Sequence, residues 1–211
     1  MTCVDDVMTR NVVAVRRDAQ FKDIVRVMRA RRFSAFPVLD DDDRVIGVVS
    51  EDDLLVRQAV TGPGAGPRFL LRHSDRAKAS GLTAAELMTT PAITIRADAA
   101  VAEAARTMHS RHVKRLPVVT ADGRLAGVVS RVDLLGEYDR PDAEIRTEII
   151  KRVIESEFVL DSLAFTVTVE SGVVTLAGPV GTEDVAVSLL AEVRRVAGVV
   201  AVRDRLSYPR R

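Results

Sequence analysis

Near the start of the chain, the spacing of hydrophobic positions changes from that of a helix to that of buried strands. Between positions 21 and 28 they follow the i, i+3, i+4, i+7 spacing of a helix with one buried face: Phe21, Ile24, Val25 and Met28. Two short apolar runs follow, 36–39 and 45–49, and these are typical of buried strands. The acidic segment Asp40–Asp43 between them predicts a hairpin turn.

The same pattern returns 80 residues later. Segments Val4–Leu55 and Ala84–Leu135 align without a gap, and 19 of the 52 paired positions are identical. Polar positions stay in register as well as apolar ones, which indicates a duplication. Each copy predicts elements in the order β-α-β-β-α. The first strands are expected at Val12–Val15 and Ala92–Ile95, and the helices that follow are expected to have Asp18 and Asp98 as N-caps.

The last third of the chain has a different pattern. A helical stripe runs through Asp142–Phe158, and alternating strands are expected around 165–169, 173–177 and 199–206. A second helix is expected at Glu183–Ala197, with Gly198 as its C-cap. The order α-β-β-α-β predicts two helices on one face of a three-stranded sheet, and the whole chain is therefore expected to be an α+β protein.

The segment between the two copies has no such periodicity. Its Gly/Pro-rich part, Thr61–Pro67, is incompatible with a regular helix or strand. The wider stretch Val56–Leu82 is basic, with one acidic residue, Asp75, against five basic ones: Arg57, Arg68, Arg72, Arg76 and Lys78. The segment is interpreted as a solvated linker, or as a flap or partner-docking arm.

Composition narrows the function classes. The 211 residues carry 31 Lys and Arg against 30 Asp and Glu, a net charge of +1, so nucleic acid is an unlikely partner. The single cysteine, Cys3, cannot form an internal disulfide. Asp5 and Asp6 stand where a signal peptide would be basic and then apolar, and no apolar stretch is long enough to span a membrane. A cytoplasmic protein is expected.

One motif with chemical content occurs in both copies, Gly-h-h-Ser-x-x-Asp, where h is hydrophobic. It places Ser50 and Asp53, and again Ser130 and Asp133, where a strand ends and a helix begins. The helix N-terminus favours an anion, the serine hydroxyl can donate to phosphate, and the carboxylate can accept from the two hydroxyls of a ribose. The same spacing is also that of a capping box, which needs no ligand. The residues alone leave both interpretations open.

Other candidates carry less chemistry. His112, Lys114 and Arg115 precede a strand, where they could contact phosphates or form a solvated basic face. His109 and His112 have metal-pair spacing, but no Cys or carboxylate at ligand spacing joins them, so no metal is expected. The sequence shows no set of nucleophile, general base and metal ligands that would form an active site, so the chain is expected not to be an enzyme.

The duplicated unit resembles a tandem pair of cystathionine-β-synthase (CBS) domains, a Bateman module. The resemblance covers Val4–Leu135 and rests on Val7-Met8-Thr9, Leu87-Met88-Thr89, the strand prolines Pro37 and Pro117, and both Ser-x-x-Asp motifs. It implies two repeats related by a pseudo-two-fold axis, a homodimer, and clefts that bind AMP, ADP, ATP or S-adenosylmethionine as a regulatory ligand rather than a required cofactor. Asp53 and Asp133 would bind ribose beside Ser50 and Ser130, and Val13 and Ile93 would line the base pockets.

The tail resembles a BON domain, through Val167-x-Val169-x-x-Gly172-Val173-Val174 and Val196-x-Gly198-Val199. The expected domains are CBS repeat 1 (1–60), a linker (61–82), CBS repeat 2 (83–138) and BON (141–208). Together the resemblances imply a non-enzymatic sensor that signals through its BON domain to a protein partner. The alternatives are a ligand-free scaffold or interaction protein, in which the motifs only cap helices, and a peripheral phospholipid-binding protein.

Overall fold

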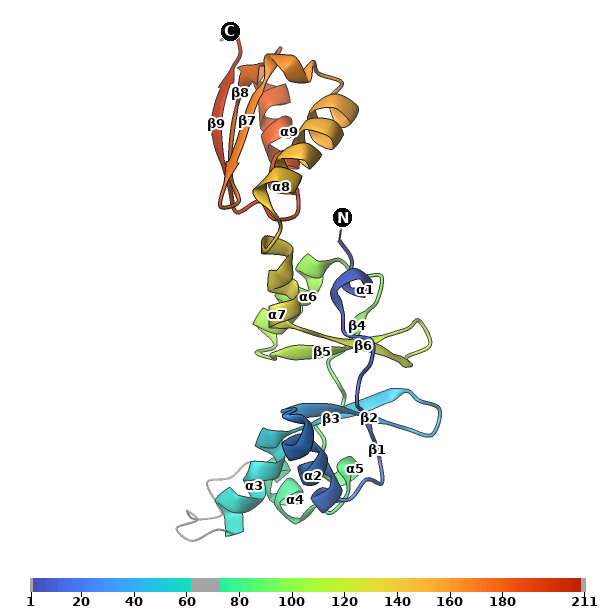
Figure 1. Ribbon diagram of the computed structural model, residues 1–211. Helices are drawn as coiled ribbons and strands as arrows, with labels where there is room; N and C mark the ends of the chain where they lie inside the picture. The colour runs from blue at the N-terminus through green and yellow to red at the C-terminus, as the bar shows by residue number, and fades with distance from the viewer. Residues whose placement is uncertain (1, 62–72, 210–211) are drawn as a thin grey trace. The chain divides into compact units, whose positions relative to one another are not determined.

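The computed structural model describes residues 2–61 and 73–209. It contains three three-stranded sheets with helices packed on them, which confirms the predicted α+β class (Figure 1). The chain divides into two compact units, residues 3–130 and residues 131–211 with 1–2. The first unit holds both sheets of the duplicated part, and the second holds the sheet of the tail.

The first repeat has the predicted order of elements. They are α1 (Val4–Val7), β1 (Val15–Arg16), α2 (Phe21–Arg31), β2 (Ala35–Leu39), β3 (Val45–Ser50) and α3 (Glu51–Thr61). Strand β2 lies in the centre of its sheet, parallel to β1 and antiparallel to β3. Ile24 and Met28 of α2 are buried against the sheet together with Phe36 and Val38, as the helical stripe predicts.

The second repeat reproduces this arrangement. It comprises α5 (Ala84–Leu87), β4 (Ile95–Arg96), α6 (Val101–Ser110), β5 (Arg115–Val119), β6 (Leu125–Ser130) and α7 (Arg131–Leu135), followed by the 3-10 turn η2 (Gly136–Tyr138). Between the repeats, α4 (His73–Ser80) lies inside the stretch interpreted as a linker, so part of that stretch is helical. Most of the Gly/Pro-rich segment lies outside the described residues.

Two local predictions are wrong. The first strand of each repeat begins later than expected, at Val15 and at Ile95. The helices after them are capped by the backbone of Gln20 and of Ala100, without a side-chain cap, rather than by aspartates. The Asp98 carboxylate is instead paired with Arg96, at 2.7 Å. An Asp two residues too early cannot reach the first free N–H groups of the helix.

Reciprocal contacts join the repeats. The backbones of Thr9 and Val128 exchange two hydrogen bonds of 2.9 Å, and Val48 and Thr89 make the equivalent pair at 3.1 and 2.8 Å. Each pair maps onto the other by the 80-residue offset of the duplication. Reciprocal contacts of this kind require a two-fold relation between the copies, so the expected pseudo-two-fold arrangement is present.

The tail forms the predicted α-β-β-α-β unit. Its elements are α8 (Asp142–Glu148), the π-helix η3 (Ile149–Glu157), the 3-10 turn η4 (Ser162–Ala164), β7 (Thr166–Glu170), β8 (Val173–Pro179), α9 (Glu183–Arg194) and β9 (Ala201–Ser207). The helices cover one face of the sheet β7-β8-β9 (Figure 1). Helix α9 is capped at Arg195, so Gly198 is not its C-cap. The absence of a side chain at Gly198 instead lets Ile145 pack closely, because a Cβ there would lie 2.7 Å from the Ile145 Cδ1 atom. None of the described helices is long and apolar enough to cross a membrane.

Candidate functional site

The Ser-x-x-Asp motif of the first repeat forms a complete capping box where β3 passes into α3. The Asp53 Oδ2 atom accepts from the Ser50 backbone N–H at 2.7 Å and from the Ser50 hydroxyl at 2.6 Å. The Asp53 backbone N–H lies 3.4 Å from the Ser50 hydroxyl oxygen, which completes the reciprocal pair. The geometry therefore agrees with the capping interpretation, and these hydrogen bonds fix the orientation of the Asp53 carboxylate.

The other carboxylate oxygen of Asp53 contacts residues from outside the first repeat. Oδ1 accepts from the Thr89 hydroxyl at 3.1 Å and forms an ion pair with the ammonium group of Lys78. Lys78 also donates to the Thr89 hydroxyl oxygen at 2.8 Å. Asp53 itself is buried, with 8% of its surface exposed, and a buried carboxylate needs such partners because it has lost its hydration.

A cleft of about 260 Å³ opens beside this carboxylate, and both repeats line it. The first repeat contributes Ser50 and the acidic start of α3, and the second contributes the segment before β4 and the segment that leads into β5. The lining residues are Ser34, Ala35, Val48, Ser50, Glu51, Asp52, Asp53, Thr89, Pro91, Ala92, Ile93, His112, Val113, Lys114 and Arg115.

Half of the residues proposed from the sequence meet in this cleft. Ser50, Asp53, Ile93, Lys114 and Arg115 all line it, although up to 65 positions separate them in the chain. The other five lie elsewhere. Pro37 and Pro117 are buried inside β2 and β5, Val13 packs on the core of the first repeat, Ser130 ends β6, and Asp133 lies in α7 of the second unit.

The cleft lining contains acidic residues from the first repeat and basic residues from the second. Glu51, Asp52 and Asp53 come from the first turn of α3, where the helix dipole favours negative side chains. Lys114 and Arg115 come from the second repeat: Arg115 begins β5, and Lys114 precedes it and is exposed. His112 precedes them in a left-handed conformation with φ of +55°. A ligand with neutral hydroxyls at one end and an anion at the other matches this polarity.

Sequence reasoning missed the two residues that contact Asp53 from outside its own motif, Thr89 and Lys78. Thr89 belongs to the duplicated Met-Thr pair, so the repeat itself marked it, but nothing in the pattern placed it on Asp53. Lys78 comes from the non-periodic stretch between the repeats, and only the position of α4 brings it to Asp53. The basic excess of that stretch was the only available signal.

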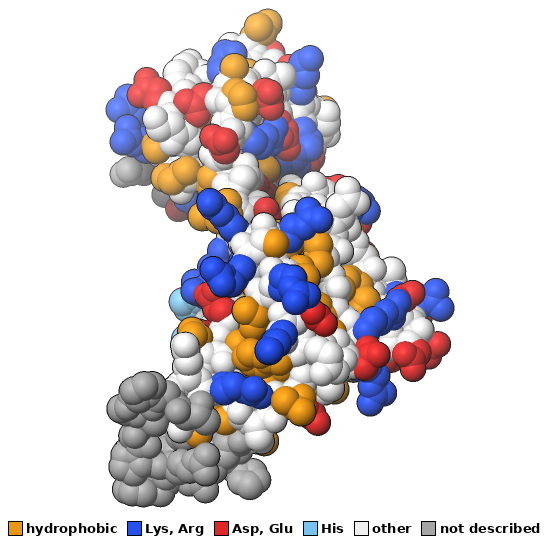
Figure 2. Space-filling model, turned by 60° about the horizontal axis from the view of Figure 1, so that its bottom comes forward, with side chains coloured by type: hydrophobic (Ala, Val, Ile, Leu, Met, Phe, Trp, Pro, Cys, Tyr) orange, Lys and Arg blue, Asp and Glu red, His pale blue; other side chains and the backbone are white. Residues whose placement is uncertain are grey.

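A larger cavity, of about 690 Å³, lies between α2 and α3 of the first repeat. Its lining is mainly apolar, from Phe21, Val25, Met28, Phe33, Leu54 and Leu55, with Arg29, Arg32 and Arg57 around it. Figure 2, in which the helical end of this repeat comes forward, shows apolar side chains exposed between Lys and Arg side chains. This cavity is lined mainly by apolar side chains and is a weaker candidate than the Asp53 cleft for a small polar ligand.

Among residues 2–61 and 73–209 there is no group of three or more His, Cys, Asp or Glu side chains that could hold a metal ion. The thiol of Cys3 donates to the Asp6 carboxylate at 3.0 Å and takes part in the cap of α1. This contact makes Cys3 a structural residue.

Family models match almost the whole described chain. The model of the CBS domain matches residues 4–59 and 84–140, and the model of the BON domain matches residues 141–210. Two curated relatives are each 29% identical. The chloroplastic CBS domain-containing protein CBSX2 of Arabidopsis thaliana aligns over 69% of this chain and 65% of its own length, and protein MJ1426 of Methanocaldococcus jannaschii over 63% and 88%.

Solved structures match the duplicated part. The crystal structure of CBSX2 in complex with AMP is 28% identical, with a TM-score of 0.58, and the match covers 64% of this chain and 95% of that one. The CBS domain pair of protein MJ0100, in complex with 5-methylthioadenosine and S-adenosyl-L-methionine, is 18% identical with a TM-score of 0.52, and this match covers 66% and 97%. The latter similarity concerns the fold alone.

Proposed function

Because this chain belongs to the CBS-domain family and carries a BON domain after its CBS pair, we propose that it is a non-enzymatic regulatory protein that binds an adenosyl ligand in the Asp53 cleft. The observation that carries the proposal is the convergence of Ser50 and Asp53 with Ile93, Lys114 and Arg115 around one cavity. Two repeats supply these residues, so a bound ligand would bridge them.

Each part of an adenosine monophosphate finds a chemically suitable partner. The Asp53 carboxylate is an acceptor for the ribose hydroxyls, and Lys114 and Arg115 are cations for the phosphate. Val48, Pro91 and Ile93 offer an aliphatic surface for the adenine ring. The chain contains only 4% aromatic residues, so aliphatic packing replaces base stacking. The AMP bound to CBSX2, a relative with 28% identity, supports this ligand class.

Titration calorimetry on protein shown to be ligand-free tests the proposal. AMP, ADP, ATP and S-adenosylmethionine are the probes, and at least one is expected to bind. Asp53→Asn, which keeps the shape of the side chain, should abolish that binding, whereas Asp42→Asn in the exposed hairpin turn should leave it unchanged. No heat with any of the four ligands would overturn the proposal.

Signalling requires that the ligand favours one arrangement of the two repeats over another, because equal affinity for both would shift nothing. We assign the BON domain the role of reporting this change to a protein partner. Because the family resemblance implies a homodimer, the apolar groove between α2 and α3 is the face at which a second copy would pack. Analytical ultracentrifugation with and without AMP measures both the oligomer and its response.

Phospholipid is a second candidate partner for the BON domain, favoured by one observation. Two apolar side chains of the segment between η3 and β7 are strongly exposed, Val159 at 81% and Leu163 at 93%. Such side chains can enter a bilayer interface. Flotation with neutral and with anionic liposomes tests this role. Leu163→Asp should remove any liposome binding if the segment inserts into the bilayer. Unmodified protein that stays unbound to both liposome types would reject the role.

A further inference from the structure

Asp53 has no acceptor capacity left for a ligand in the described structure. An ionised carboxylate offers about four lone-pair sites. Two are taken at Oδ2 by the backbone and hydroxyl of Ser50, and two at Oδ1 by Lys78 and Thr89. A ribose that donates both of its hydroxyls to Asp53 must therefore displace some of these donors.

The four donors are not equally easy to displace. Those of Ser50 belong to the helix cap and come from the same turn of chain. The hydroxyl of Thr89 can rotate and still accept from a neighbouring group. The ammonium of Lys78 sits directly on Oδ1, and the side chains of the pair are only 15% and 10% exposed. Lys78 is therefore the donor whose departure would free an acceptor site on Oδ1.

We propose that Lys78 is an internal competitor for the ligand of the Asp53 cleft, so that binding displaces its ammonium group from Asp53 and loosens the end of helix α4. This proposal rests on the proposed function and concerns the regulation of that same site. We call the contacts of Lys78 with Asp53 and Thr89 the Lys78 latch. Helix α4 leads from the first repeat to the second, and its end is also held by the Arg57 guanidinium, which donates to the Gly81 carbonyl oxygen. Release of the latch would leave that second tie in place.

The latch predicts that removing a basic side chain strengthens ligand binding, which is the opposite of the usual effect. Loss of a positive charge beside an anionic ligand ordinarily weakens binding. Loss of a competitor instead strengthens it, because the apparent dissociation constant of a partly blocked site is raised by the inverse of its open fraction. If the latch is closed about nine-tenths of the time, removal of Lys78 tightens binding about tenfold.

Calorimetric titration of AMP into the unmodified chain and three variants tests the sign of this effect. Lys78→Met keeps the aliphatic stem and should bind AMP about tenfold more tightly than the unmodified chain. Lys22→Met removes the same charge from an exposed position of α2 and should leave the affinity unchanged. Lys78→Gln, which can still donate a hydrogen bond but carries no charge, should fall between them. Weaker or equal binding by both Lys78 variants would overturn the latch.

Hydrogen exchange separates failure of the latch from failure of the proposed function. Asp53→Asn should increase amide exchange in residues 77–80 without any ligand, and AMP should produce the same change in the unmodified chain. If Asp53→Asn loosens α4 but no variant binds an adenosyl ligand, the proposed function fails while the contact stands. If AMP binds and α4 exchange does not change, the latch fails while the proposed function stands.

Discussion

Met88 lies so close to Gly47 that a Cβ atom placed on the glycine would be 2.4 Å from the methionine sulfur. Met8 lies in the same way against Gly127, at 2.6 Å. Each methionine comes from the repeat opposite its glycine, so the two pairs clamp the sheets of the CBS pair together. The glycine of the Gly-h-h-Ser-x-x-Asp motif is therefore needed by a neighbouring repeat rather than by a ligand.

We expect Gly47→Ala to destabilise the CBS pair by about 1–3 kcal/mol, because the added methyl group overpacks a filled contact. Gly127→Ala should cost more. Its Cβ would also lie 2.8 Å from the backbone oxygen of Thr9, which cannot move aside as a thioether can. Chemical unfolding followed by circular dichroism measures both changes.

A double-mutant cycle provides the control. Met88→Ala removes the side chain that the new methyl group meets, so Gly47→Ala should cost much less in that background than alone. Additive effects of the two substitutions would contradict the clamp and would point to a backbone cause at Gly47.

The duplication and its elements could be predicted because both depend on local periodicity and on identities in strict register. Ser50 and Asp53 were singled out because their motif occurs in both copies. Ile93 was expected from the family resemblance, and Lys114 and Arg115 from their charge before a strand; the structure brings all five to one cleft. Helix starts were less accurate. Asp18 and Asp98 have the right chemistry for N-caps, but the chain turns two residues later, at Gln20 and Ala100.

The partners of Asp53 could not be predicted for a different reason. Lys78 and Asp53 are 25 positions apart, and their contact depends on how α4 packs on the first repeat rather than on any pattern within α4. Pro37 and Pro117 illustrate the opposite case, in which a clear sequence signal marks residues that do not line the cleft. They mark the family, but their buried places in the central strands contribute to the core and not to the cleft lining.

We expect Ser50→Ala to lower stability more clearly than it lowers ligand affinity. The Ser50 hydroxyl donates to Asp53 at 2.6 Å, so its proton is committed to the cap rather than to a phosphate. Loss of an N-cap side chain costs about 0.5–2 kcal/mol. Thermal unfolding and AMP titration of the same variant separate the two effects. A large loss of affinity with unchanged stability would instead assign the hydroxyl to the ligand.

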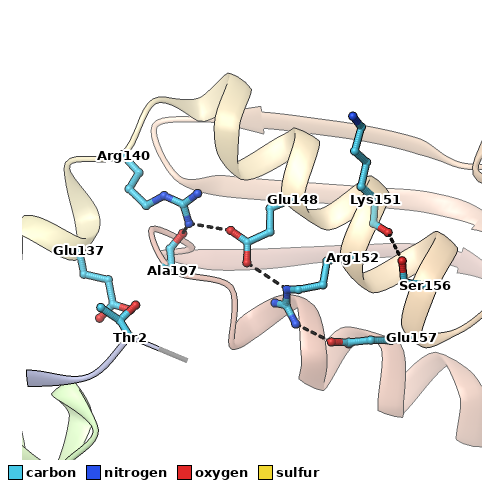
Figure 3. A network of polar contacts seen from close by, with 9 residues as sticks. All are labelled: Thr2, Glu137, Arg140, Glu148, Lys151, Arg152, Ser156, Glu157 and Ala197. Carbon is cyan, nitrogen blue, oxygen red and sulfur yellow. Dashed lines mark hydrogen bonds and ion pairs between the residues drawn. The ribbon is translucent and has the colours of Figure 1, made fainter. Parts of the chain in front are cut away.

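We expect the BON domain to lose stability in acid through Glu148, which bridges Arg140 at 2.8 Å and Arg152 at 3.0 Å (Figure 3). Burial alone would raise the pKa of Glu148, but the hydrogen bonds and charges of the two arginines outweigh it and lower the pKa below its ordinary 4.5. A carboxyl with a lowered folded-state pKa contributes stability above 4.5 that disappears as the pH falls through the folded value.

Unfolding measured between about pH 3 and pH 6 checks this prediction. Glu148→Gln should be less stable than the unmodified chain at the upper end, and the difference should shrink as the pH falls. Glu144→Gln, an exposed glutamate of α8, serves as the matched control and should show a much smaller pH-dependent difference. A constant difference between Glu148→Gln and the unmodified chain would mean that the arginines do not hold the charged form.

We expect Lys114 and Arg115 to recognise the phosphate and not the nucleoside. A hydrogen bond to a charged group contributes about 1.5–3 kcal/mol, so Lys114→Ala with Arg115→Ala should weaken AMP binding by at least about tenfold. Adenosine carries no phosphate, and its affinity should change little. Arg111→Ala removes a neighbouring exposed charge that does not line the cleft and should leave AMP binding nearly unchanged. Equal losses for AMP and adenosine in the double variant would place these two side chains at the base or the ribose, and the polarity assigned to the cleft would have to be reversed.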